Sequence, residues 1–154
     1  MVGIRHEDRY HVLMSKRIEL KCEAETEAFG RDFAKGLKKG DFVAMYGDLG
    51  AGKTAFVRGM ASYLVPGERV SSPTYAIVNE YIGKENTLCH FDMYRITDED
   101  DLYSIGFWDY RDCIFAIEWA ENIPYALPES YYKVTITKGE GDTRFIEIEE
   151  KGAK

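Results

Sequence analysis

Apolar residues along this chain of 154 residues occur in two kinds of pattern, short runs and stripes with helical spacing. Continuous apolar runs at residues 41–47 and 113–119 are typical of strands that are buried on both faces of a sheet. Alternating positions and other strand-like runs predict further strands. These segments are residues 17–22, 74–82, 87–94 and, as two strands around a glycine-rich turn, the tail 131–150.

Helical spacing appears in the segments between these strands. Residues 26–40 carry apolar side chains at intervals of four, which predicts a helix with Thr26 as its N-cap and Gly40 at its end. A second helix is predicted from residue 53 to about Leu64, because Pro66 stops it shortly afterwards.

The order of the elements predicts the architecture. A short third helix is expected at residues 97–107 with Thr97 as its N-cap, and the polar turn at residues 83–86 predicts a hairpin. Strands and helices alternate in the middle of the chain, so we expect an α/β fold. This fold is a mainly parallel sheet flanked by helices, with antiparallel strands and a C-terminal hairpin. Residues 1–15 are interpreted as an irregular leader and a candidate for disorder, and residues 16–154 as a single domain.

Composition and charge are those of a globular protein. Hydrophobic residues make up 45% and charged residues 31%, which is enough apolar material for a core. No apolar stretch approaches the length of a membrane span, and the N-terminus does not have the apolar region of a signal peptide. We therefore expect a cytoplasmic protein that does not bind a membrane. The formal net charge is −7, whereas proteins that bind RNA by themselves usually carry a basic face. A partner would therefore hold any nucleic acid.

A glycine-rich turn carries the strongest chemical signal in the sequence. "GDLGAGKT" fits the Walker A pattern G-x-x-x-x-G-K-[ST], with an apolar strand before it and a predicted helix after it. Glycines let the backbone N–H groups point at phosphate oxygens, and the helix adds the positive end of its dipole. Lys53 would contact the β- and γ-phosphates, and the Thr54 hydroxyl would bind Mg²⁺. The residues expected to contact the nucleotide here are Gly47, Asp48, Leu49, Gly50, Ala51, Gly52, Lys53, Thr54 and Ala55.

Two carboxylates complete a candidate site for a P-loop ATPase. The Asn-Lys-x-Asp and Asp-x-x-Gly segments of GTPases are missing from the sequence, so exclusion favours ATP. Asp92 and Glu118 each end an apolar strand, where a carboxylate can hold the metal ion or order a water molecule. The alternative for each is an ordinary solvated or salt-bridged carboxylate. His90 faces the same side as Asp92 and is interpreted as a structural partner of that carboxylate rather than as a catalyst.

Two further positions have both a functional and an ordinary interpretation. Thr74 lies in "SSPTY", whose hydroxyls could contact a γ-phosphate or its metal ion, or could simply begin a strand. Trp119 follows Glu118 directly, and it could stack on an adenine, contact a partner or pack in the core.

Four segments together resemble the TsaE family. They are "GDLGAGKTAFVRGM", "SSPTYAIVNEY", "HFDMYRI" and "IEWAENI", in this order and spacing. The resemblance spans roughly residue 18 to the C-terminal strands. It implies an ATPase that binds ATP with Mg²⁺ and hydrolyses it slowly when alone. It also implies the partners TsaB and TsaD, which transfer a threonylcarbamoyl group to an adenosine beside the tRNA anticodon and which ATP turnover is thought to reset.

The resemblance also implies roles for individual residues. Lys53 would contact phosphates, Thr54 the metal ion, and Asp92 and Glu118 the metal ion and the attacking water, without a division between the two carboxylates. Thr74 matches a switch-like position, and Trp119 matches a functionally important tryptophan. These matches add Thr74 and Trp119 to the expected nucleotide contacts.

Two rival functions remain compatible with the Walker A pattern. A small P-loop kinase would transfer the γ-phosphate to a metabolite, and a nucleotide-sensing adaptor would have no useful turnover. Kinases of that type usually carry an arginine-rich lid, whereas the arginines that follow the glycine-rich turn are dispersed along this sequence. They are Arg58, Arg69, Arg95, Arg111 and Arg144.

Overall fold

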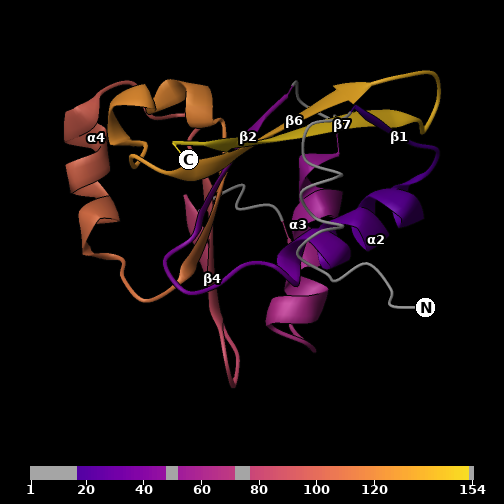
Figure 1. The fold of residues 1–154 in the computed structure, drawn as a ribbon. Coiled ribbons are helices and arrows are strands. Elements are labelled where there is room, and N and C mark those ends of the chain that lie inside the picture. The colour runs from indigo at the N-terminus through magenta and orange to yellow at the C-terminus, as the bar shows by residue number, and fades with distance from the viewer. Residues whose placement is uncertain (1–16, 48–51, 72–76, 153–154) are drawn as a thin grey trace.

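A seven-stranded sheet runs through the structure, a computed structural model that describes residues 17–47, 52–71 and 77–152 (Figure 1). The strand order across the sheet is β1-β7-β6-β2-β5-β4-β3. The predicted leader lies outside the described residues. The strands are β1 (Ile18–Leu20), β2 (Phe42–Tyr46), β3 (Val78–Ile82), β4 (Thr87–Asp92), β5 (Ile114–Glu118), β6 (Tyr131–Lys138) and β7 (Arg144–Lys151).

The centre of the sheet is parallel and its edges are antiparallel. β2 pairs in parallel with β5 and β6, and β4 pairs in parallel with β5. Antiparallel pairs join β3 to β4, β6 to β7 and β1 to β7. The predicted mainly parallel sheet, the hairpin around residues 83–86 and the C-terminal hairpin are therefore confirmed. The apolar runs of β2 and β5 lie where both faces of the sheet are covered, as continuous apolar runs require.

Helices cover both faces of this sheet (Figure 1). On one face lie α2 (Glu23–Ala34) and α3 (Lys53–Leu64), and α3 has the predicted extent. On the other face lie α4 (Glu99–Ser104) and three short 3₁₀ helices. These are η1 (Phe107–Asp109), η2 (Ala120–Asn122) and η3 (Pro124–Ala126).

The predicted ends of α2 are wrong. The helix begins after Cys22, whose backbone is extended, and Thr26 lies inside its first turns with its hydroxyl donating a hydrogen bond to the Cys22 carbonyl at 3.4 Å. The helix ends at Ala34 rather than Gly40, because the next N–H groups bond three residues back instead of four and so tighten the chain into a turn.

The predicted N-cap of α4 is also displaced by one residue. Asp98 rather than Thr97 caps the helix, and its carboxylate accepts a hydrogen bond from the Asp101 N–H at 3.0 Å. The Thr97 N–H and hydroxyl both donate to the Asp101 carboxylate at 2.8 Å. The Asp98 carboxylate therefore caps a free N–H group of the first turn, and Thr97 closes the helix start from the outside through Asp101.

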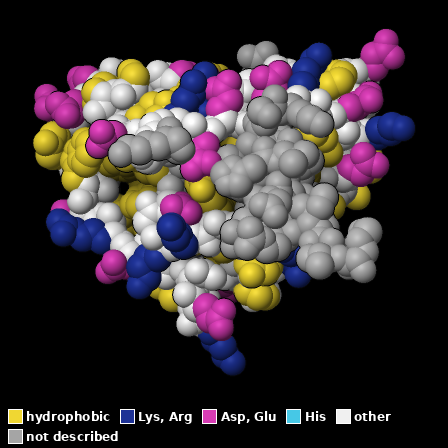
Figure 2. Space-filling view, viewed as in Figure 1, with side chains coloured by type: hydrophobic (Ala, Val, Ile, Leu, Met, Phe, Trp, Pro, Cys, Tyr) yellow, Lys and Arg dark blue, Asp and Glu magenta, His cyan; other side chains and the backbone are white. Residues whose placement is uncertain are grey.

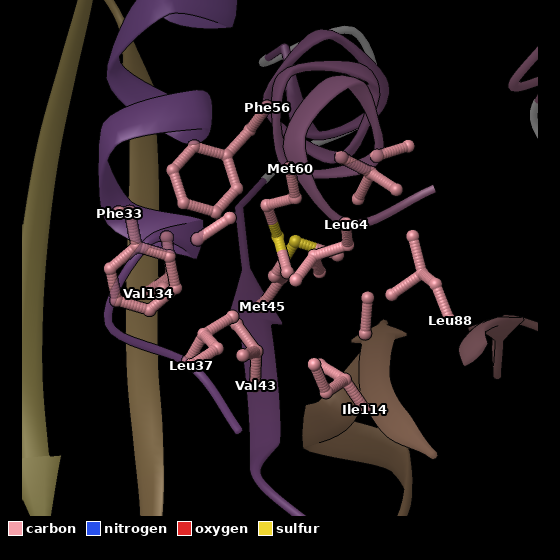
Figure 3. Close-up of a cluster of buried hydrophobic side chains, with 14 of the residues drawn as sticks. Phe33, Leu37, Val43, Met45, Phe56, Met60, Leu64, Leu88, Ile114 and Val134 are labelled. Carbon is pink, nitrogen blue, oxygen red and sulfur yellow. The ribbon is translucent and has the colours of Figure 1, made fainter. Parts of the chain in front are cut away.

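Close packing of α2 on α3 builds one half of the core. A Cβ atom on Gly30 would lie 2.3 Å from the Phe56 carbonyl oxygen, and one on Gly59 would lie 2.0 Å from the Glu27 carbonyl oxygen. The two helices therefore approach through their glycines. Figure 3 shows the side chains of both helices pointing toward those of β2, β4, β5 and β6. The buried residues labelled there are Phe33, Leu37, Val43, Met45, Phe56, Met60, Leu64, Leu88, Ile114 and Val134.

Candidate nucleotide-binding site

The glycine-rich turn and the two predicted carboxylates come together at the carboxyl ends of the parallel strands. β2 leads into the turn, α3 begins at Lys53 directly after it, and β5 and β4 are the next strands on one side of β2. In open α/β sheets, ligands bind in the crevice at this edge. Gly52 precedes α3 with φ 101°, a left-handed conformation that glycine adopts without strain. Asp48, Leu49, Gly50, Ala51 and Thr74 lie outside the described residues.

Asp92 and Glu118 are direct neighbours across two strands. They end β4 and β5 and are register partners in the parallel ladder, so their side chains share one face of the sheet. Glu118 is buried, with 5% of its surface exposed, and Asp92 is partly buried. One oxygen of Asp92 accepts a hydrogen bond from the Tyr94 N–H at 2.9 Å.

The environment of Asp92 has opposing effects on the pKa of its carboxyl, and the net effect is to raise it. Burial raises the pKa of its carboxyl above the ordinary value, and the charge of Glu118 raises it further. The hydrogen bond from Tyr94 and the electrostatic influence of His90 and Lys53 act in the opposite direction and lower the pKa. A cation bound between the two carboxylates would remove the repulsion between them.

Lys53 is a buried cation that points into the same region. Only 4% of its surface is exposed, and its Nζ donates a hydrogen bond to the Gly47 carbonyl at 2.5 Å. The Nζ also lies over the ring of Trp119, 4.6 Å from the ring centroid. A lysine this deeply buried needs partners for its charge. Here these are a carbonyl dipole and an aromatic face, and an anion would be a stronger partner than either.

Trp119 bridges the site and the core. Its backbone is left-handed with φ 58°, which is uncommon for a residue with a side chain, and its ring lies 5.0 Å from the ring of Tyr94. The ring packs partly against the core on the α4 face and partly under Lys53. The predicted core contact is therefore present, and the Lys53 contact puts the ring beside the lysine that is predicted to bind phosphate.

A cavity of about 290 Å³ joins these residues. Seven predicted positions line it together: Gly52, Lys53, Thr54, Ala55, Asp92, Glu118 and Trp119. Gly47 is connected to it through the hydrogen bond from Lys53. Within the described residues, no group of three or more His, Cys, Asp or Glu side chains is arranged to hold a metal ion.

Sequence reasoning missed five residues that line the same cavity. Two lie in the first turns of α2, one in α3 and two at the turn of the C-terminal hairpin: Glu23, Thr26, Arg58, Asp142 and Arg144. Glycines in both helices were a usable signal for a close approach of α2 to α3. The hairpin carries no local signal, because only the pairing of β6 with β2 brings it to the glycine-rich turn.

Two of the dispersed arginines thus line the same cavity. Arg58 forms ion pairs with Glu23 at 2.8 Å and with Glu27 at 3.3 Å. The Arg144 guanidinium donates to the carbonyls of Gly141 and Thr143 and lies against Gly52, where a Cβ atom would be 3.6 Å from its Nε. Spacing along the sequence therefore did not predict which arginines reach the cavity.

Comparison with known proteins identifies the family. The family described as "Threonylcarbamoyl adenosine biosynthesis protein TsaE" matches residues 20–146. The chain belongs to the TsaE family. It is 40% identical over 127 residues to a tRNA threonylcarbamoyladenosine biosynthesis protein TsaE from Haemophilus influenzae, covering 78% of this chain and 80% of that protein. It is 33% identical over 147 residues to a TsaE from Nostoc sp., covering 92% and 90%.

The fold has a counterpart among solved structures. The crystal structure of YdiB from Bacillus subtilis matches this TsaE-family chain with a TM-score of 0.70 at 30% sequence identity, over 91% of this chain and 88% of that one. Both the predicted family and the P-loop-like α/β fold are therefore confirmed. The four segments that resemble the family all lie inside the matched residues, and the leader lies before them.

Proposed function

We propose that this chain is an ATPase that binds ATP with Mg²⁺ and acts in the cytoplasm, in the formation of threonylcarbamoyladenosine in tRNA. Membership of the TsaE family supports the tRNA-modification pathway. The observation that supports the ATPase activity is the single cavity that contains Lys53 and Thr54 at the start of α3 and Asp92 and Glu118 at the ends of β4 and β5.

Lys53 and the start of α3 would bind the phosphates. Phosphate binding would transfer the hydrogen bond of Lys53 from the Gly47 carbonyl to a charged oxygen, which is a stronger acceptor. The Thr54 hydroxyl lies one residue further along the first turn, where the dipole of α3 favours an anion. Mg²⁺, held by Thr54, a carboxylate and the phosphates, would neutralise charge that develops during phosphoryl transfer.

Asp92 and Glu118 would divide two tasks, holding the metal ion and ordering the attacking water. Both carboxylates occupy the same edge of the sheet as Lys53, as these tasks require. The water would donate a hydrogen bond to one carboxylate oxygen, which turns a water lone pair toward the γ-phosphate.

TsaB and TsaD are the proposed partners, and they would carry the tRNA. The net charge of −7 disfavours direct RNA binding. On the face seen in Figure 2, basic and acidic side chains of the described residues are interspersed and form no continuous basic area. Helices that could span a membrane are not found within residues 17–47, 52–71 and 77–152.

The test is Mg²⁺-dependent ATP hydrolysis by the chain alone and with TsaB and TsaD from the same source. Low basal hydrolysis that rises with the partners is expected, and Lys53→Ala and Glu118→Gln should abolish it. Arg95→Ala is a matched control, because Arg95 is exposed and does not line the cavity. Hydrolysis that stays unchanged with partners that bind each other, or that survives both cavity variants, would contradict the proposal.

Small-molecule phosphorylation remains the second candidate because Arg58 and Arg144 line the cavity. Arg58 is held by ion pairs and Arg144 by turn carbonyls, and neither arginine is carried on a separate lid among the described residues. Phosphate that appears on an added metabolite, with no stimulation by TsaB and TsaD, would support the kinase instead.

A further inference from the structure

His90 and Glu118 form a buried pair directly beside the cavity. His90 is completely buried, and its Nε2 lies 2.5 Å from the Oε2 of Glu118. His90 precedes Asp92 by two residues in β4, so the two side chains project from the same face of the sheet. The pair therefore connects the interior of the sheet to the carboxylate at the edge of the cavity.

The arrangement assigns the proton on the imidazole ring. A carboxylate accepts hydrogen bonds, so Nε2 carries the hydrogen and donates it to Glu118. The Nδ1 atom is buried, with no hydrogen-bond partner among the residues that the structure describes. A hydrogen on Nδ1 would be a buried donor without an acceptor, and a bare lone pair there costs less.

A purely space-filling role does not explain this histidine. Leu88 lies two residues earlier on the same face of β4, is fully buried and packs in the core with apolar atoms alone. A leucine at position 90 would avoid the cost of the unpartnered Nδ1 atom. The cost of burying Nδ1 without a hydrogen-bond partner is explained if the hydrogen bond from Nε2 to Glu118 is itself required.

We propose that His90 is a positioning residue for Glu118, a role that rests on the proposed ATPase activity. Its hydrogen bond holds Oε2 and thereby restricts the rotatable side chain of Glu118. The other carboxylate oxygen is then available to the cavity, which Glu118 lines together with Lys53 and Asp92. A fixed carboxylate orders water or a metal ion better than a mobile one, because its side chain loses no further conformational entropy during the reaction.

The first test compares His90→Leu with His90→Gln. Leucine removes the donor, and we expect kcat for ATP to fall about 10- to 100-fold, the range seen when groups that orient catalytic ligands are lost. The KM for ATP should change little, because Lys53 and the helix start still bind the phosphates. Glutamine places an amide nitrogen near the position of Nε2 and should restore much of the loss. Cys89→Ala is the matched control, because Cys89 is the adjacent buried residue on the opposite face of β4.

The outcomes separate the two proposals. If the wild-type protein is active and a folded His90→Leu variant is equally active, the positioning role of His90 is overturned and the proposed ATPase function is not. Equal losses in His90→Leu and Cys89→Ala, or a loss in nucleotide affinity rather than kcat, would also overturn it. A wild-type protein that does not hydrolyse ATP with or without TsaB and TsaD would overturn the proposed function itself.

A second measurement is made on the wild-type protein, and a variant at position 90 is needed only to assign the spectrum. Nitrogen-15 chemical shifts of the His90 ring in the wild-type protein report which nitrogen carries the hydrogen. A hydrogen on Nε2 is expected, and a hydrogen on Nδ1 with a bare Nε2 would exclude donation to Glu118 and overturn the positioning role. The spectrum of His90→Gln identifies the resonances that belong to His90.

Discussion

Gly59→Ala tests whether the close approach of α2 and α3 is as tight as the structure shows. Helix propensity alone predicts that alanine in the middle of α3 stabilises the protein by about 1 kcal/mol. The structure predicts the opposite sign. The added Cβ would lie 2.0 Å from the carbonyl oxygen of Glu27, 2.8 Å from its carbonyl carbon and 3.0 Å from the Arg31 nitrogen.

All three contacts are with backbone atoms, so no side chain can rotate to relieve them. The helices must separate, which loosens packing around Phe33 and Phe56, whose ring centroids are 5.5 Å apart. Overpacking of a core usually costs about 1–3 kcal/mol and sometimes more. Because these contacts are so short, we take the upper end, and after the gain in propensity we expect a net loss of about 2 kcal/mol.

Urea unfolding followed by circular dichroism measures this difference as a shift of the midpoint at constant slope. Ala28→Gly in α2 is the matched control, because Ala28 is exposed and the change should cost about 1 kcal/mol from propensity alone. A Gly59→Ala protein that is as stable as the wild type, or more stable, would refute the close helix approach.

Three further predictions concern the cavity. Burial raises the pKa of the Asp92 carboxyl, so its ionised form destabilises the folded state above that pKa. In urea unfolding, Asp92→Asn should be more stable than the wild type at pH 8, and the difference should shrink as the pH falls toward the ordinary aspartate pKa of about 3.9. A difference that does not depend on pH would count against the raised pKa. Arg58→Ala loses two partly exposed ion pairs and should cost only about 0.5–1 kcal/mol in urea unfolding, less at high salt. A loss several times larger that is unaffected by salt would show that these pairs are not screened by solvent. The fluorescence of Trp119 should change when Mg-ADP is added to a Trp108→Phe protein, because phosphate draws the Lys53 amine from the ring; Lys53→Ala should abolish this change, and its persistence would rule out the lysine as its origin.

Local sequence patterns determined the elements and most of the candidate site. The apolar runs predicted β2 and β5, and helical spacing together with Pro66 predicted the extent of α3. The glycine-rich turn needs a strand before it and a helix after it, and carboxylates at strand ends project at one edge of a parallel sheet. These predictions succeed because the periodicity of a strand or helix and the chemistry of a phosphate-binding turn are properties of neighbouring residues.

Only the tertiary structure decided which distant residues meet. The register between β4 and β5 brings His90 to Glu118, and nothing local in either strand specifies that register. The pairing of β6 with β2 carries Arg144 to the glycine-rich turn, although the two are far apart in sequence. The Thr26 hydroxyl turned inward because α2 starts earlier than its cap-like residue suggests. Strand order, register and helix crossing depend on how the whole core packs, so they emerge only when all the elements are in place.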